Sequence, residues 1–125
     1  MNTTKLTIVM SFLFLLLVGC NKEVSKEEFC SYVNVGKIDE TIPFINEFLS
    51  DLSSNLDDKQ KLQALEVWLK SYPCIIDATI LCVSCIYTLP AQSEMLISFE
   101  ENGVVKEFTL DISMSNPLKA VRYHE

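Results

Sequence analysis

Residues 95–110, MLISFEENGVVKEFTL, decide the fold of this chain. The dipeptide Asn102-Gly103 is the strongest short signal for a two-residue hairpin turn, because both turn positions require a positive φ. A turn there fixes the register of the flanking runs, so that Met95 faces Leu110 and Ile97 faces Phe108. Apolar residues then meet across the ladder, and the stretch predicts an antiparallel β-hairpin.

Further strands are expected on both sides of this hairpin. Residues 75–81 are rich in β-branched side chains and alternate in polarity, which predicts a strand with Ile76 and Cys82 in line with its apolar face. Residues 121–123, after the break at Asn116-Pro117, can add a short fourth strand. The sheet is therefore expected to have three or four antiparallel strands.

The first of two predicted helices lies within residues 38–56. Isoleucine and leucine recur there every three or four positions and form one apolar stripe. Because Pro43 is tolerated only near a helix start, regular helix is expected to begin at residues 39–41 and to end at residues 53–55.

The second predicted helix begins after Asp57, which forms a capping box with Gln60, and it ends at Pro73. Two apolar-striped helices with a short link form an antiparallel hairpin that must cover an apolar surface. We therefore expect an α+β fold, with a helical hairpin packed on a three- to four-stranded antiparallel sheet.

The start of the chain resembles the signal peptide of a bacterial lipoprotein. An apolar core of about a dozen residues follows a lysine and ends in the lipobox Leu17-Val18-Gly19-Cys20. This core is shorter than the roughly 20 residues that span a bilayer. The resemblance implies cleavage after Gly19 and attachment of a diacylglyceryl group to Cys20. Asn21 replaces the aspartate that retains many such lipoproteins at the inner membrane, which favours the outer membrane.

The predicted organisation has three parts: a signal peptide over residues 1–19, an acylated cysteine and flexible stalk over residues 20–28, and a single α+β domain over residues 29–125. Cleavage leaves 125 − 19 = 106 residues, enough for one hydrophobic core. Since Lys5 is lost with the signal peptide, the mature formal charge is 9 − 17 = −8. This charge disfavours nucleic acid as a partner and leaves the lipid chains as the contact with the membrane.

Four cysteines follow the lipobox, namely Cys30, Cys74, Cys82 and Cys85. An even number in an exported domain indicates disulfides, because the compartment is oxidising. If residues 75–81 form a strand, Cys74 lies roughly 26 Å from Cys82, whereas a bridge needs Cα atoms within about 7 Å. Cys74 then pairs with Cys30, and Cys82 pairs with Cys85 if the chain turns or bulges there. If the strand continues instead, free thiols remain.

Few residues offer catalytic chemistry. The only histidine, His124, is interpreted as a frayed side chain, which excludes Ser-His-Asp and Cys-His machinery. By alternation, Asp77, Glu94, Glu107 and Asp111 lie on the sheet face away from the helices, where carboxylates are solvated. The sequence predicts a protein that is not an enzyme, with no catalytic residue, no metal site and no cofactor.

The same helix-averted face is more apolar than a wetted sheet requires. Alternation and the following loop place Leu81, Val83, Tyr87 and Leu96 there, and these are the predicted binding residues. Exposed apolar patches often mark binding surfaces. The alternative is that residues 29–35 or the C-terminal segment fold over this face.

The layout of residues 38–112 resembles two families, the β-lactamase-inhibitor-protein fold and the small accessory lipoproteins of the outer-membrane barrel-assembly machine. The first functional hypothesis is a membrane-anchored lipoprotein of the cell envelope that binds another envelope protein through its sheet face or through residues 86–93. The alternative is a tethered thiol–disulfide or metal-handling protein that uses Cys82 and Cys85.

Overall fold

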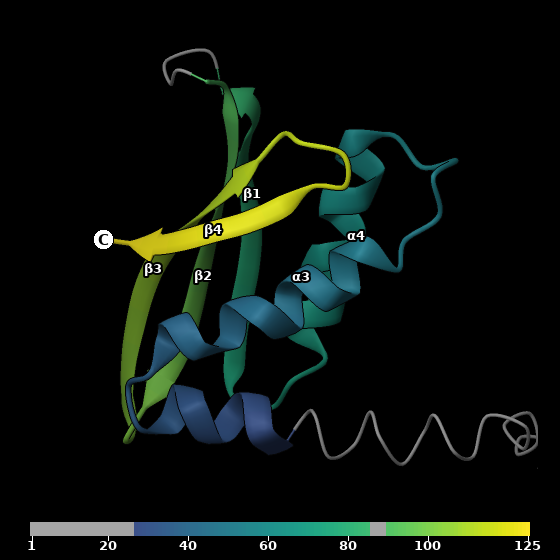
Figure 1. The fold of residues 1–125 in the computed structure, drawn as a ribbon. Helices are drawn as coiled ribbons and strands as arrows, with labels where there is room; N and C mark the ends of the chain where they lie inside the picture. The colour runs from purple at the N-terminus through teal and green to yellow at the C-terminus, as the bar shows by residue number, and fades with distance from the viewer. Residues whose placement is uncertain (1–26, 86–89) are drawn as a thin grey trace, which may run out of the picture.

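A computed structural model describes residues 27–85 and 90–125 (Figure 1). Helices pack on one face of a four-stranded antiparallel sheet, which confirms the predicted α+β fold. The elements in chain order are a helix over residues 27–34, the 3₁₀ helix η1 (Ile38–Thr41), α3 (Ile42–Ser50), α4 (Asp58–Lys70), β1 (Ile75–Cys85), β2 (Gln92–Glu101), β3 (Val104–Ser113) and β4 (Lys119–His124).

The sheet has the simple order β1-β2-β3-β4, with each strand beside its neighbour in sequence. The β2–β3 hairpin has the predicted register, since Met95 pairs with Leu110 and Ile97 pairs with Phe108. Asn102 and Gly103 have φ values of 53° and 80°, as the two-residue turn requires. The predicted fourth strand is present as β4.

The helices begin where local chemistry favours it. Asp57 Oδ1 accepts a hydrogen bond from Gln60 N–H at 2.8 Å, and Asp57 N–H donates to Gln60 Oε1 at 2.9 Å, so the predicted capping box is confirmed. The first predicted helix is shorter than expected. Its residues 38–41 form η1, and α3 ends at Ser50 rather than at residues 53–55.

The helix over residues 27–34 is part of the folded body. Phe29 is fully buried, and its ring contacts those of Phe44, Trp68 and Tyr72. The Cys30–Cys74 disulfide ties this helix to the segment between α4 and β1, as predicted. The predicted stalk over residues 20–28 is therefore too long by two residues, because residues 27 and 28 are helical; the rest of it lies outside the described residues.

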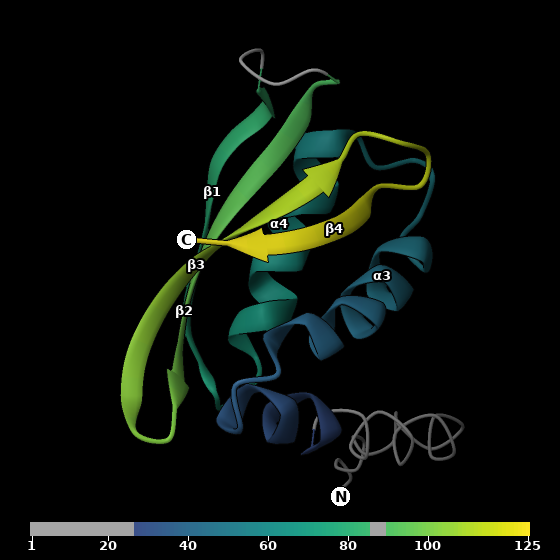
Figure 2. The same ribbon diagram turned by 60° about the vertical axis from the view of Figure 1, so that its left-hand side comes forward.

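One residue on each edge strand of the sheet is hydrogen-bonded to a helix side chain. On β1, the Ile80 N–H donates to Glu66 Oε2 of α4 at 2.6 Å. On β4, Ala120 N–H donates to Asn46 Oδ1 at 2.7 Å, and Asn46 Nδ2 donates back to the Ala120 carbonyl at 3.1 Å. These contacts require α3 and α4 to lie on one side of the sheet, and Figure 2 shows them there. An unpaired strand edge is a template for another strand, and these contacts occupy part of each edge.

Irregular pairing in β1 overturns part of the predicted alternation. The register shifts between Ile75 and Asp77 and again between Ile80 and Cys82. Ile75 is buried and Ile76 is half exposed, the reverse of the prediction. Because each bulge adds one residue to β1, it moves the following side chains to the other face. Cys82 therefore leaves the apolar face and lies opposite Glu94. Within residues 27–85 and 90–125, every helix is too short or too polar to cross a bilayer.

Candidate functional site

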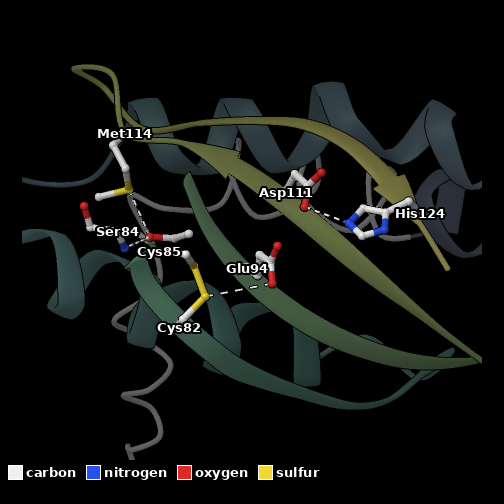
Figure 3. The surroundings of a disulfide bond; sticks show 8 residues. Cys82, Ser84, Cys85, Glu94, Asp111, Met114 and His124 are labelled. Carbon is white, nitrogen blue, oxygen red and sulfur yellow. Dashed lines mark hydrogen bonds and ion pairs between the residues drawn. A yellow bond between two sulfur atoms is a disulfide. The ribbon is translucent and has the colours of Figure 1, made fainter. Parts of the chain in front are cut away.

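One line of polar residues crosses all four strands on the helix-averted face. Cys82 of β1 pairs with Glu94 of β2, Glu94 pairs with Asp111 of β3, and Asp111 pairs with Arg122 of β4. We call these four residues, together with His124 of β4, the polar row; Figure 3 labels all of them except Arg122. Since facing residues on neighbouring strands lie about 5 Å apart, the row is one continuous surface of charged and sulfur-containing groups.

The first end of the row is the Cys82–Cys85 disulfide, which confirms the second predicted bridge. Ser84 lies inside the four-residue turn with φ of 52°, the left-handed region that is uncommon for residues other than glycine. Its N–H donates to the buried Ser93 Oγ at 2.9 Å, and Ser93 Oγ donates to Met114 Sδ at 2.9 Å (Figure 3). These contacts hold the disulfide turn against β2.

Glu94 connects the two ends of the row. Its Oε1 lies 3.9 Å from the Sγ atom of Cys82. Cys82 is half-buried, whereas its disulfide partner Cys85 is only 4 % exposed. In the dithiol state the Cys82 S–H can donate to this carboxylate. The arrangement therefore gives one accessible sulfur, one shielded sulfur and a nearby proton acceptor.

Asp111 is the buried centre of the other end, with a side chain only 1 % exposed. Arg122 Nε lies 2.8 Å from Oδ2, and His124 Nε2 lies 2.9 Å from Oδ1. A buried carboxylate requires such partners, because burial without them costs several kcal/mol. Two interpretations of the sequence are therefore wrong: Asp111 is not a solvated carboxylate, and His124 is not a frayed side chain.

Two groups of potential metal ligands share Glu94. Ligand atoms of Cys82, Cys85 and Glu94 lie within 4.8 Å of one another, and so do those of Glu94, Asp111 and His124. The first group has its sulfurs joined in a disulfide. The second has one imidazole nitrogen and two carboxylates from three adjacent strands.

The predicted binding residues are partly placed by the structure. Leu81 lies at the β1 bulge and is 50 % exposed, and Val83 is 36 % exposed. Leu96 lies on the helix-averted face between the buried Met95 and Ile97 and is half-buried. Tyr87 and the lipidation residue Cys20 lie outside the described residues.

The two segments proposed as alternative covers lie elsewhere. Residues 29–34 belong to the helix whose Phe29 and Val33 are buried in the core, and residues 119–124 form β4 of the sheet itself. Each is thus used in the body of the domain, and Leu81 and Val83 keep their exposed area.

Neither Arg122 nor His124 was predicted as a site residue from the sequence. A signal was present, because the hairpin register that pairs Met95 with Leu110 also places Glu94 opposite Asp111. Like charges directly opposite each other destabilise a sheet, so a third strand had to supply a cation.

No family model, no curated protein and no solved structure matches this chain. The resemblances to bacterial lipoproteins and to the two helix-on-sheet families stay predictions from the sequence.

Proposed function

We propose that this chain is a lipid-anchored protein of the cell envelope, held at the outer membrane, whose domain binds another protein without catalysing a reaction. Support for the anchor comes from the lipobox that ends at Cys20. The helix that starts at residue 27 follows seven residues later. Seven residue steps span at most about 25 Å. A domain attached at Cys20 therefore remains close to the lipid headgroups.

The helix-averted face of the sheet is the binding surface in this proposal. Helices cover the opposite face. At Ile80 and Ala120 the edge backbone groups are bonded to Glu66 and Asn46, which disfavours addition of a partner strand there. The observation that carries the proposal is the 50 % exposure of Leu81, which lies at the bulge of β1 beside this face.

The chemistry of this surface specifies the partner. Half-buried Leu96 lies between Thr79 and Thr109 in the sheet, so small uncharged groups surround an apolar centre. Exposed carboxylates of Asp77 and Glu107 lie farther along the same strands. A protein surface with apolar side chains flanked by lysine or arginine fits this pattern, and its charge complements the acidic domain.

In-cell crosslinking tests the proposal. A photoreactive amino acid at position 79, an exposed residue that pairs with Leu96 on this face, should capture one specific envelope protein. Leu81→Asp should abolish this capture while the circular dichroism of the domain stays unchanged. Val67 of α4, 69 % exposed on the helix side, is the matched control position. Equal capture from position 67, or capture that survives Leu81→Asp, would rule out this face as the binding surface.

The anchor has its own test. Palmitate fed to cells should label the wild-type chain and not Cys20→Ser, and the variant should leave the membrane fraction. If the wild-type chain stays unlabelled, the lipid anchor is contradicted. The crosslinking result does not depend on this outcome.

A second function is favoured by Glu94 beside Cys82. In thiol–disulfide exchange, a thiolate of a substrate dithiol attacks Cys82 Sγ and Cys85 leaves as the thiolate. The second substrate thiol then attacks the mixed disulfide and releases Cys82, so that two electrons and two protons pass from the substrate to the cysteine pair. Glutathione titration with mass mapping should then reduce Cys82–Cys85 before Cys30–Cys74, and Glu94→Gln should slow that step. If both disulfides resist reduction by glutathione equally, this function is excluded.

A further inference from the structure

We propose that Glu94, Asp111 and His124 bind a divalent transition-metal ion of the zinc class. The three side chains come from β2, β3 and β4 and point toward one region of the helix-averted face (Figure 3). One ligand atom of each lies within 4.8 Å of the other two. The fold thus brings one potential ligand from each of three adjacent strands to the same place.

The distance between two of the three ligand atoms is close to the spacing in a zinc site. Zinc bonds to nitrogen and oxygen are about 2.0–2.2 Å long, which places neighbouring ligand atoms about 3–3.5 Å apart. His124 Nε2 and Asp111 Oδ1 are 2.9 Å apart, close to that spacing. A hydrogen atom between these two atoms holds them together, and a metal ion can take its place after a small rotation of the imidazole.

Arg122 orients the buried carboxylate for this role. It contacts Oδ2 of Asp111 at 2.8 Å, which leaves Oδ1 for the histidine side. Ligating carboxylates are commonly held by such outer partners, which fix their direction. Since Arg122 offsets one of the two carboxylates, the site retains a net negative charge that favours a cation.

The imidazole can adopt the tautomer that metal binding requires. His124 Nδ1 lies 3.3 Å from the Glu125 carbonyl oxygen. With the proton on Nδ1 donated to that carbonyl, the Nε2 lone pair faces Asp111 and is available to the ion. Glu94 has about four lone-pair sites on its carboxylate, so it can bind the ion while keeping its other contacts.

The ligand set favours zinc over calcium and magnesium. One imidazole and two carboxylates suit zinc, whereas calcium needs six to eight oxygen ligands and magnesium an octahedral oxygen shell. Three protein ligands leave a coordination position for water. The site is also open to solvent, because His124 is 43 % exposed above the buried Asp111.

The proposal is independent of the cysteine chemistry. In the disulfide state the sulfurs of Cys82 and Cys85 are bonded to each other, so the ion is held by nitrogen and oxygen alone. Zinc binding by the oxidised chain therefore distinguishes this site from a thiolate site.

The experiment uses the full-length chain without an affinity tag, extracted in detergent with both disulfides intact. Zinc chloride titrated by calorimetry should show one site with a dissociation constant in the micromolar range or lower. Because His124 is the only histidine, zinc should shift a single pair of imidazole signals in the NMR spectrum. His124→Gln and Glu94→Gln should each weaken binding at least about 10-fold, the order of effect seen when metal-site groups are removed.

Glu107→Gln is the matched control, since it removes an exposed carboxylate from the same strand as Asp111. It should bind zinc like the wild type. The proposal is overturned if the oxidised chain binds no zinc, if His124→Gln binds with wild-type affinity, or if binding appears only after reduction. Unchanged His124 signals in saturating zinc would also overturn it.

Discussion

The two disulfides should differ sharply in what they contribute to stability. Cys30 and Cys74 are separated by 44 positions, and Cys82 and Cys85 by 3. In the chain-entropy model, stabilisation grows with the logarithm of loop length, which gives about 4 kcal/mol for the long loop and about 1.5–2 kcal/mol for the short one. The long bridge also holds the helix over residues 27–34, so its loss frees the buried Phe29.

The comparison uses two double variants, Cys30→Ala/Cys74→Ala and Cys82→Ala/Cys85→Ala, in residues 21–125 exported to an oxidising compartment. Urea unfolding can be followed by fluorescence, because the chain has one tryptophan. Trp68 stacks on Phe48 with ring centroids 4.6 Å apart and contacts Phe29 edge-on at 6.0 Å, so its signal reports on the helix layer.

The first double variant should lose more than twice the unfolding free energy that the second loses. An equal loss, or a larger loss from the Cys82–Cys85 pair, would refute the loop-length argument. It would mean instead that the short bridge stabilises the domain through the contacts of its turn with Ser93.

Three further outcomes follow from single contacts. Glu66→Ala removes the acceptor for the Ile80 N–H, which should lower the unfolding free energy by about 1–3 kcal/mol. It should also allow concentration-dependent pairing of two chains through β1, which light scattering can detect. Gln63→Ala on the same helix should show neither effect. Asp57→Ala breaks the capping box of α4 and should cost about 1 kcal/mol in urea unfolding, with Ser54→Ala in the same loop as the neutral control. Burial, with a smaller effect from Glu47, raises the pKa of Tyr72 to about 12 from the ordinary value of 10.0. The unfolded chain then releases this proton first, so stability should fall as the pH rises from 10 toward 12; Tyr72→Phe should flatten the curve there, and an unchanged slope would contradict this assignment.

The β2–β3 hairpin and helix α4 could be predicted from sequence because their signals are local. Asn102-Gly103 fixes the turn, and the turn fixes the β2–β3 register without reference to the rest of the chain. Asp57 and Gln60 likewise form their contacts within one helical turn. Local patterns of this kind are decided by neighbours within a few residues, and tertiary packing did not override them.

The faces of β1 could not be predicted because bulges are set by packing. Period-two alternation placed Ile76 with the core, but the register shift after Ile75 exposes it. The Cys82–Cys85 turn was expected only as one of two alternatives. The turn that forms makes a tertiary contact, from Ser84 to Ser93 on the neighbouring strand. An alternation rule cannot contain that information.

The polar row combines both kinds of signal. On β4, Arg122 and His124 are two residues apart, so a regular strand points both to the same face, while Tyr123 between them points to the core. Arg122 lies opposite Asp111, and His124 lies opposite Thr109, two positions away on β3. Arg122 thus reaches the Asp111 carboxylate from the directly opposite position, and His124 reaches it along the diagonal. Once Glu94 is known to face Asp111, a basic–apolar–basic strand is the pattern that allows Asp111 to be buried beside a second carboxylate. The same geometry places an imidazole where a metal ion could replace the hydrogen atom between His124 and Asp111.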